Sequence, residues 1–581
     1  EGLYSFVGNL SAVAVVSQGD EEIDGQASAR AMASRTRPGG DDSAIFLKKE
    51  EEGRGPRTVF FALDDAPRKG GSKRTSSLDY EVKEAAKAFS PAEFATMSEA
   101  AAGTAPDDAE QRRRADAVRR AMKHAWTGYK EHAFGRDELK PVSGRGSDNW
   151  GGLAVTMVDS LDTLWMMGLK DEFDDAERWI DANLRFDRAG DVSVFETTIR
   201  ELGGLLSAFD LSKRRVFLDK AVDLGRRLAA AFDTPSGVPT GTVSLRESSS
   251  SSKRSGGGWT SGNAVLAELG TLQLEFRYLA SKSGDATLAA KANRVFEKVL
   301  ALKPPNGLFP IFISPTSGQV ASRKITFGAL GDSFYEYLLK TWIQGGKTET
   351  ALRRAYDAAV QGLFDRKMIQ RSSPSNLAYV ADLDNGNYVP KMDHLVCFLP
   401  GTLALGAYTD PEGLASKRAT RDLDLAKSLL YTCVQMYERS PTKLAPEFVN
   451  FRPGKDFEVA SAAPFNILRP ETVESLFVLF HLTKDPVYRD WAWRIFQAFD
   501  ARCRTPFAFG SVTDVRRTGQ QPEDRMESFF LAETMKYLFL IQDPDIPPDF
   551  DLTDNVVFNT EAHPIAVLGP TGNHISRALL S

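Results

Sequence analysis

The sequence predicts an all-α fold, an (α/α)7 barrel in which inner and outer helices alternate along the chain. Two observations lead to this prediction. Helix-forming segments follow one another from about residue 108 to about residue 541, and they are of two kinds. Some have one apolar stripe and one charged face, as exposed helices do, whereas those between them are apolar nearly all round, as buried helices are. About fourteen alternating segments would form seven hairpins in two rings.

The first predicted helix begins with acidic residues, which complement the helix dipole, and carries Ala117, Met122 and Trp126 on one stripe. Segments such as 172–184 and 485–502 have a charged face and are predicted as outer helices, and the apolar segment 470–483 as an inner helix. The predicted helices are 108–131, 153–168, 172–184, 195–211, 213–231, 260–282, 284–302, 332–344, 348–366, 394–407, 419–438, 470–483, 485–502 and 524–541.

Two regions outside these helices differ in composition. Residues 1–105 are rich in Ser, Gly, Ala and charge and show poor periodicity, so we interpret them as a disordered stem or the remnant of an anchor. Within them, 57–63 is a candidate isolated strand. Residues 106–581 are predicted to form the barrel domain, with a flexible Ser- and Gly-rich insertion at 246–259.

Composition excludes several classes of function. The formal net charge of −6 argues against nucleic acid as a partner, which favours a basic surface. Three cysteines are too few for a disulfide scaffold or a Cys-rich zinc site, and the six histidines show no paired spacing. No apolar run reaches the ~18 residues that a membrane span requires.

Acidic side chains recur beside apolar positions of the inner helices. A buried carboxylate is unfavourable unless it is paired or binds a metal. One acidic residue in a first turn commonly compensates the helix dipole, but Glu336 and Glu474 lie further along, where capping does not explain them. The sequence therefore predicts an acidic funnel on the barrel axis, formed by Asp159, Asp162, Glu196, Glu268, Asp332, Glu336, Asp393, Glu471, Glu474, Glu527 and Glu533.

Such a funnel suits sugar chemistry. Two carboxyl groups with different pKa values can act as general acid and general base at a glycosidic bond. Phe195, Phe529 and Phe530 offer faces on which a sugar ring can stack. Surplus carboxylates favour a hard cation held by oxygens, Ca²⁺ before Mg²⁺. Arg200 and Arg469 either neutralise the funnel or bind substrate hydroxyls. From the residues alone, the prediction is a glycosidase or a sugar-binding barrel.

Several motifs resemble those of a known family. The stretches "TMVDSLDTLWMMGL", "FETTIRELGGLLSAF", "FGALGDSFYEYLLKTWIQGG", "KMDHLVCFLPG", "LRPETVES", "MESFFLAETMKYLFLI" and "VFNTEAHP" occur in order between about 108 and 566. They resemble the class I α1,2-mannosidases of glycoside hydrolase family 47. The resemblance implies an (α/α)7 barrel, inverting hydrolysis of terminal α1,2-linked mannose from N-glycans, and a Ca²⁺ ion that binds the sugar.

The resemblance also implies roles for individual residues. Glu196 matches the proposed general acid, which acts directly or through a water. Asp332 and Glu471 match the two candidates for the general base, of which we favour Glu471. Thr560 matches the residue that binds Ca²⁺ through its hydroxyl and carbonyl oxygens, on a segment that closes one end of the barrel. The substrate-binding or water-holding positions are Arg200, Glu268, Leu330, Asp393, His394, Arg469, Glu474, Phe529, Glu533 and Glu561.

Two further positions gain meaning from the resemblance. Cys397 and Cys433, which as isolated cysteines are most simply free buried thiols, match the disulfide of the family, which implies an oxidising secretory compartment. Leu330 stands where members of the endoplasmic reticulum type carry an Arg that limits cleavage to one mannose. Leu there resembles the Golgi type, and implies trimming of Man9 or Man8 towards Man5.

The expected partners are high-mannose N-glycans of glycoproteins. The expected protein is a monomer, tethered to the lumenal side of the Golgi membrane, or alternatively of the endoplasmic reticulum, through an N-terminal anchor. A rival hypothesis is a quality-control mannose lectin of the same fold that directs misfolded glycoproteins to degradation with little hydrolysis. A zinc-dependent α/α barrel is disfavoured because no Asp, Cys and His ligand set is evident.

Overall fold

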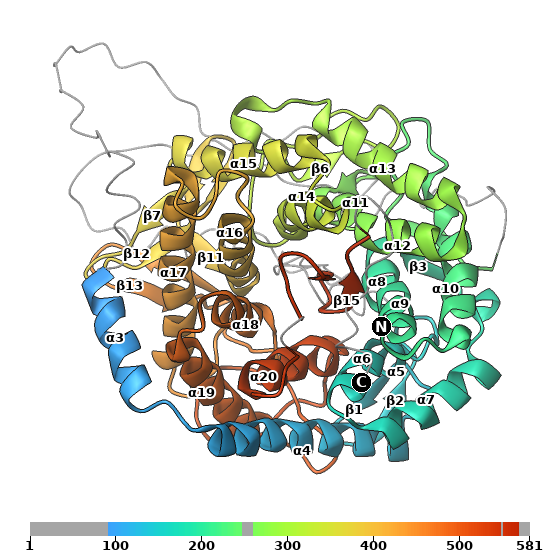
Figure 1. Ribbon diagram of the computed structural model, residues 1–581, viewed down its shortest axis with the longest axis horizontal. Helices are drawn as coiled ribbons and strands as arrows, with labels where there is room; N and C mark the ends of the chain where they lie inside the picture. Colours follow the sequence, from blue (N-terminus) through green and yellow to red (C-terminus); the bar gives the residue numbers. More distant parts are fainter. Residues whose placement is uncertain (1–90, 247–259, 548–549, 569–581) are drawn as a thin grey trace, which may run out of the picture. The chain divides into compact units, whose positions relative to one another are not determined.

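The computed structural model describes residues 91–246, 260–547 and 550–568, all of which belong to one compact unit. The predicted disordered stem up to residue 90, the candidate strand at 57–63 and the insertion at 247–259 lie outside these residues. Within them, two kinds of helix alternate as the sequence predicts, and seven outer helices surround seven inner ones (Figure 1).

The outer helices are single and regular, and each packs against an inner neighbour. Their bounds are α4 (Asp108–His132), α7 (Lys170–Asn183), α10 (Arg215–Leu228), α13 (Ala286–Leu300), α15 (Thr350–Asp365), α17 (Lys417–Glu438) and α19 (Pro486–Cys503). Four of them, α4, α13, α17 and α19, begin with a side-chain cap. Asp107, for example, accepts a hydrogen bond from the Glu110 amide, and Ser416 accepts one from the Ala419 amide.

The inner helices form a closed ring in which α6, α9, α12, α14, α16, α18 and α20 contact one another in turn and η6 contacts α6 again. Five of the seven are broken into shorter pieces. The inner elements are α5 (Val155–Asp159), α6 (Leu161–Met166), α8 (Val194–Thr197), η2 (Thr198–Leu202), α9 (Gly203–Ser212), α11 (Leu266–Gly270), α12 (Gln273–Ser283), α14 (Asp332–Gln344), η5 (His394–Phe398), α16 (Leu399–Tyr408), α18 (Glu471–Thr483), η6 (Phe530–Thr534) and α20 (Met535–Gln542).

Besides these breaks, the bounds of three predicted elements differ from the structure. The helix predicted at 524–541 begins only at Phe530, and the hydroxyl of Ser528, just before it, bonds to Asp159 and Arg200. The helix predicted at 260–282 starts at Leu266 and is interrupted at residues 271–272. Residues 91–103, predicted as the end of the disordered stem, form helix α3 (Pro91–Gly103), whose Ser98 bonds to Asp485 beside α19.

Short antiparallel strand pairs, which the helical prediction did not include, precede several inner helices. Strand β3 runs directly into α8, β5 into α11 and β11 into η5, so hydrogen-bonded pairs fix the entry points of these helices. The strands are β1 (Glu138–Lys140), β2 (Arg145–Ser147), β3 (Asp191–Ser193), β4 (Thr242–Ser244), β5 (Ala264–Val265), β6 (Phe312–Ile313), β7 (Ile369–Arg371), β8 (Ala378–Val380), β9 (Asp382–Asp384), β10 (Asn387–Val389), β11 (Lys391–Asp393), β12 (Phe448–Arg452), β13 (Asp456–Val459), β14 (Val556–Phe558) and β15 (Pro564–Ala566). Short 3-10 helices are η1 (Phe186–Arg188), η3 (Ala229–Phe232) and η4 (Pro305–Gly307).

The hairpin of β14 and β15 lies inside the ring of inner helices, where β14 contacts α14 and β15 contacts α9 (Figure 1). Its close approach depends on Gly203 of α9, since a Cβ atom there would lie 2.6 Å from the Nδ2 atom of Asn559. The turn between the two strands, 559–563, carries Thr560. This is the C-terminal segment that the sequence predicts to enter the barrel.

A buried ionic cluster holds one side of this turn. The ammonium group of Lys536 lies 2.8 Å from Asp162 and donates to the Ala562 carbonyl at 2.6 Å. His563 lies between two carboxylates, with Nδ1 2.7 Å from Asp162 and Nε2 3.1 Å from Asp159. All four side chains are wholly or almost wholly buried, so each charge depends on its partners instead of on water.

Replacement of Lys536 by Met should therefore destabilise the barrel strongly. The change leaves the Asp162 carboxylate buried with less compensation, and removal of one partner of a buried ion pair costs about 3–5 kcal/mol. Urea unfolding followed by far-UV circular dichroism measures the loss. Lys347→Met, which removes an exposed pair with Asp554, is the matched control and should cost at most about 1 kcal/mol. Equal losses in the two variants would contradict this account.

Candidate active site

The acidic side chains predicted from the inner helices come together inside the barrel. Helices α14 and α18 begin at Asp332 and Glu471, so both carboxylates lie in a first turn, close to the positive end of the helix dipole. Two inner helices contain π-helical segments, and these carry Arg200 and Glu533. Such irregular turns re-aim side chains and are frequent at functional sites.

Glu196 is held by Arg200, one helical turn further along. The Arg200 Nε atom donates to Glu196 Oε2 at 2.9 Å. The same guanidinium pairs with Glu561 on the turn of the β14–β15 hairpin and lies 3.6 Å from Asp159. Burial disfavours its charge, but Glu561 and Glu196 outweigh this and raise the pKa of Arg200. One cation thus joins the predicted general acid to the segment that carries Thr560.

Glu471 has a different environment. His394 Nδ1 donates to Glu471 Oε2 at 2.7 Å, and Arg469 lies 3.5 Å from Oε1. The Thr472 hydroxyl lies 2.9 Å from the other ring nitrogen of His394 and fixes the ring. Burial would raise the pKa of Glu471, but the His394 hydrogen bond and the Arg469 charge outweigh it, so this pKa lies below its usual value. Glu471 is therefore ionised at neutral pH.

Asp332 differs from Glu471 in this respect. Burial raises the pKa of Asp332 to about 8, against the hydrogen bond that it accepts from the Ser333 amide, and Glu336 and Glu471 add to the rise. Leu330 lies two residues earlier with a positive φ of 81°, a conformation that is rare for a bulky residue. Strained backbone of this kind clusters at functional sites.

Thr560 lies among carboxylates. Its hydroxyl donates to Glu336 Oε2 at 2.9 Å. Lys340 pairs with the other oxygen of Glu336 and lies 3.6 Å from Glu474. Burial raises the pKa of Glu474 to about 8, although Lys340 opposes the rise. The Lys340 ammonium thus serves two carboxylates next to Thr560.

Other predicted residues lie around this centre, but Phe530 does not offer a face to a sugar, because it is wholly buried and packs against Phe499 and Phe509. Burial, with the charges of Glu471 and Glu474, raises the pKa of Glu533, and burial likewise raises that of Glu561 against the effect of Arg200. Phe529 lies between two guanidinium groups, with ring-centre distances of 5.7 Å to Arg200 and 6.0 Å to Arg469. Buried Asp393 accepts from the Ala329 amide and pairs with Lys391 at 2.7 Å.

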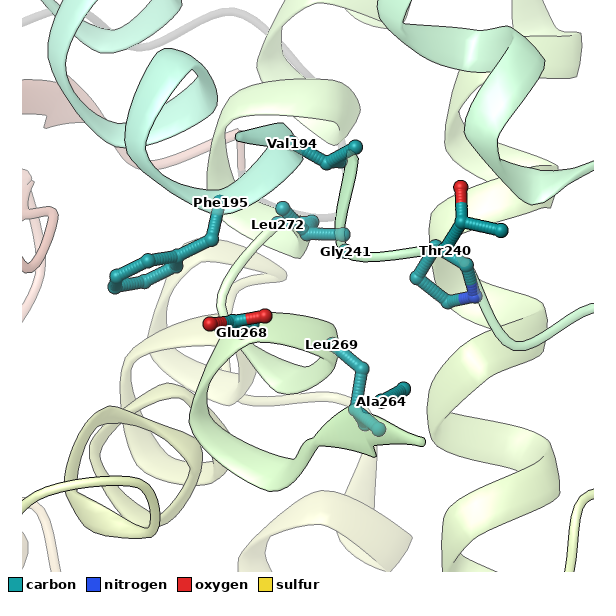
Figure 2. A pocket seen from close by; sticks show the side chains of 9 residues that line it. Val194, Phe195, Thr240, Gly241, Ala264, Glu268, Leu269 and Leu272 are labelled. Carbon is teal, nitrogen blue, oxygen red and sulfur yellow. The ribbon is translucent and has the colours of Figure 1, made fainter. Parts of the chain in front are cut away.

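Glu268 borders a small pocket lined also by Phe195, Gly241 and Leu272 (Figure 2). Burial raises the pKa of Glu268 to about 7, and the nearby charge of Glu196 adds to the effect. Figure 2 shows the Glu268 carboxyl group and the Phe195 ring on neighbouring inner elements. Glu268 thereby extends the acidic cluster on the side of Glu196.

The donor set fits a hard divalent cation. Around Thr560 the candidate ligands are hydroxyl, carbonyl and carboxyl oxygens, which suit Ca²⁺. The carboxyl groups of Glu474, Glu533 and Glu561 have raised pKa values, and a nearby divalent cation would favour their ionised forms. In the described part of the chain, no three His, Cys, Asp or Glu side chains converge as a direct metal-binding group. A site centred on Thr560 therefore calls for further oxygens from water or sugar.

Several supporting residues escaped the prediction. Trp150 stacks 5.3 Å from the Arg200 guanidinium, and its indole donates to Glu138 at 3.0 Å. Glu447 binds Arg469, with Nε donating to Oε2 at 2.6 Å. Neither Trp150 nor Glu447 lies in a predicted helix, so periodicity gave no signal for them. Lys340 had a signal, because a lysine four residues after Glu336 in an apolar segment indicates a buried ion pair.

The two cysteines predicted to pair do so. Cys397 and Cys433 form a disulfide that joins η5 to α17, with Cα atoms 5.9 Å apart. The bond lies three residues from His394 and so ties the Glu471 side of the site to an outer helix. Cys503 is a buried free thiol, and burial raises its pKa.

Comparison with known proteins agrees with this architecture. Residues 121–567 match the model of glycosyl hydrolase family 47. The chain is 43% identical over 466 residues to mannosyl-oligosaccharide 1,2-alpha-mannosidase MNS1 of Arabidopsis thaliana, covering 80% of each protein. It is 45% identical to the endoplasmic reticulum mannosyl-oligosaccharide 1,2-alpha-mannosidase of Homo sapiens, over 77% of this chain and 63% of that protein. The solved structure of alpha-1,2-mannosidase from Trichoderma reesei matches with a TM-score of 0.72 at 29% identity, over 78% of this chain and 99% of that one. The chain belongs to glycosyl hydrolase family 47.

Proposed function

We propose that the chain hydrolyses terminal α1,2-linked mannose from high-mannose N-glycans with inversion of configuration. The observation that carries this proposal is the contrast between Glu196 and Glu471, two carboxyl groups at the starts of inner helices with different partners. Glu471 is ionised by its contacts with His394 and Arg469, as a general base must be. The relatives of this chain are named as 1,2-alpha-mannosidases, which supports the substrate class.

In the proposed reaction, Glu196 supplies a proton to the glycosidic oxygen, directly or through a water. Glu471 takes a proton from the water that attacks the anomeric carbon from the opposite face. Asp332, whose pKa rises to about 8, is largely protonated at neutral pH and is the weaker candidate for the base. Arg200 contacts Glu196, Arg469 contacts Glu471, and Phe529 lies near both guanidinium groups, so the three residues would orient the sugar.

We propose Ca²⁺ as the cofactor, held by Thr560 and by water molecules. These waters would donate hydrogen bonds to the carboxylates of Glu336, Glu474, Glu533 and Glu561. When bound, the ion would coordinate vicinal sugar hydroxyls and help to hold a distorted ring. The chain's own contribution is to aim the Thr560 hydroxyl, through Glu336, and to keep several carboxyl oxygens within the barrel.

The cellular setting is also proposed. A buried disulfide and a relative named for the endoplasmic reticulum support a location in the secretory pathway. Leu330 favours the Golgi type over the endoplasmic reticulum type. In the described residues, no helix combines the length and apolarity that crossing a bilayer requires. A monomer tethered to the membrane by an N-terminal anchor remains our proposal.

The test of the acid is Glu196→Gln. We expect kcat for mannose release from free Man9 glycan to fall by roughly two or more orders of magnitude, because the amide donates no proton. Product analysis over time measures the loss. Glu110→Gln, on the exposed start of α4, is the control and should release mannose at the wild-type rate. Unchanged kcat in Glu196→Gln would remove Glu196 from the mechanism, and a wild type that binds Man9 without releasing mannose would favour the lectin hypothesis.

Calcium removal should abolish turnover. After treatment with EGTA, mannose release is expected to stop, and added Ca²⁺ is expected to restore it, whereas Mg²⁺ is not, because Mg²⁺ keeps its waters and prefers strict octahedral geometry. The melting temperature should fall on chelation and recover with Ca²⁺. Full activity and an unchanged melting temperature in EGTA would contradict the proposed cofactor.

Specificity should depend on Leu330. In Leu330→Arg, the first mannose should be released from Man9 while later steps slow by roughly tenfold or more, so that Man8 accumulates, because a charged side chain two residues before Asp332 restricts which branch can enter. Leu330→Met, which keeps an apolar side chain of similar volume, should still reach Man5. A Leu330→Arg variant with the wild-type product series would show that specificity is set elsewhere.

A further inference from the structure

A chain of hydrogen bonds connects the backbone of Thr560 to two inner helices. The Thr560 amide donates to the Tyr337 hydroxyl at 3.3 Å, and that hydroxyl donates to Glu275 Oε1 at 2.7 Å. The neighbouring Asn559 donates from Nδ2 to the same carboxyl oxygen at 2.8 Å. Tyr337 and Asn559 therefore meet at one atom of Glu275.

Asn559 also holds the turn that contains Thr560. Its Oδ1 atom accepts from the amides of Glu561 at 2.9 Å and His563 at 2.8 Å, so it bridges the turn internally. Its Nδ2 atom donates as well to the carbonyl of Ile199, in the π segment that carries Arg200. The position of the turn relative to the barrel wall thus depends on Asn559, and that of Asn559 on Glu275.

These contacts lie where water does not compete. Glu275, Tyr337 and Asn559 are wholly buried. Glu275 lies on α12 and Tyr337 on α14, so neighbouring inner helices supply the acceptor and the hydroxyl. Hydrogen bonds in such a setting are geometrically restrictive, because a lost partner cannot be replaced by solvent.

We propose that Glu275 and Tyr337 are positioning residues for Thr560, and that they fix the backbone of this residue so that its hydroxyl and carbonyl oxygens bind Ca²⁺ together. The inference rests on the calcium site proposed above. Glu336 orients the hydroxyl, but a ligand that uses both a side-chain and a main-chain oxygen also needs a fixed backbone. The Tyr337–Glu275 pair meets this requirement, because Tyr337 binds the backbone amide of Thr560.

A purely structural role makes a different prediction. If the pair only stabilised the barrel, its loss would lower the melting temperature without changing the affinity for Ca²⁺ in the folded protein. A positioning role predicts weaker binding of Ca²⁺ as well, since loss of a group that orients a metal ligand typically costs 10- to 100-fold in metal affinity.

Tyr335 offers a matched control on the same helix. Like Tyr337 it is buried, and its hydroxyl accepts from one backbone amide, that of Phe309 at 3.0 Å, and donates to one acceptor, the Phe309 carbonyl at 3.2 Å. Tyr335→Phe and Tyr337→Phe therefore delete equivalent hydroxyls, and only one of these is linked to Thr560.

The experiment is calorimetric titration of Ca²⁺ into the full chain after removal of metal, with melting temperatures recorded in EGTA. Both variants should lose a similar amount of thermal stability without metal. Tyr337→Phe should bind Ca²⁺ about tenfold more weakly than the wild type, and Tyr335→Phe with wild-type affinity. Equal affinities in the two variants would overturn the positioning role and leave the calcium site standing, whereas a wild type that binds no Ca²⁺ would overturn both.

Glu275 supplies a second, independent comparison. Glu275→Gln keeps an acceptor oxygen for Tyr337 and Asn559 and should bind Ca²⁺ within about threefold of the wild type, whereas Glu275→Leu removes the acceptor and should lose about tenfold or more. Affinity that stays at the wild-type value in Glu275→Leu would contradict the proposal. If Glu275→Leu does not fold, Tyr337→Phe against Tyr335→Phe decides the question.

Discussion

The interior of this barrel is governed by the free-energy cost of burying carboxyl groups. Along the axis, Glu471, Glu474, Glu533, Glu561 and Asp332 are removed from water to different degrees, and few cations compensate them. Each cation therefore serves more than one carboxylate. Arg200 joins Glu196 to Glu561, and Lys340 joins Glu336 to Glu474. This shared compensation leaves the site acidic.

The same shortage of positive charge separates the roles of similar side chains. Glu471 has a histidine and an arginine beside it and stays ionised, whereas Glu268, without such a cation, has a pKa of about 7. Carboxyl groups of one barrel thus differ in their protonation at neutral pH because of the charges beside them.

The ring of alternating helices could be predicted from the sequence because it depends on local information. Periodicity separates a charged face, as in α7, from an all-apolar segment, as in α18, and the prediction of α14 at 332–344 agrees with the structure at both ends. The strand pairs and helix breaks could not be predicted in this way, since β5 pairs with β6, and Thr271 at the helix break bonds to Ser333, both partners being distant in sequence.

The residues of the candidate site likewise fall into those that the sequence could predict and those that it could not. Residues within motifs, such as Glu196, Glu471 and Thr560, were found by resemblance, and the acidic pattern was visible in the inner segments themselves. Partners that only the folded chain brings together were not found. Glu275 and Asn559 lie 284 residues apart, and Glu447 reaches Arg469 from a segment with no helical pattern. Their roles follow from contacts, which composition and spacing do not encode.

The hairpin inside the barrel has a consequence for biosynthesis. Thr560 and Glu561 follow every helix of the ring, and the Gly203 face of α9 receives them only at the end. A ribosome delivers the N-terminal portions of a chain first. The wall of the barrel therefore emerges from the ribosome before its central segment, and a nascent chain that still lacks this segment has carboxylates without the turn that organises them. The β14–β15 turn can therefore dock on α9 only after all the helices of the ring have been synthesised.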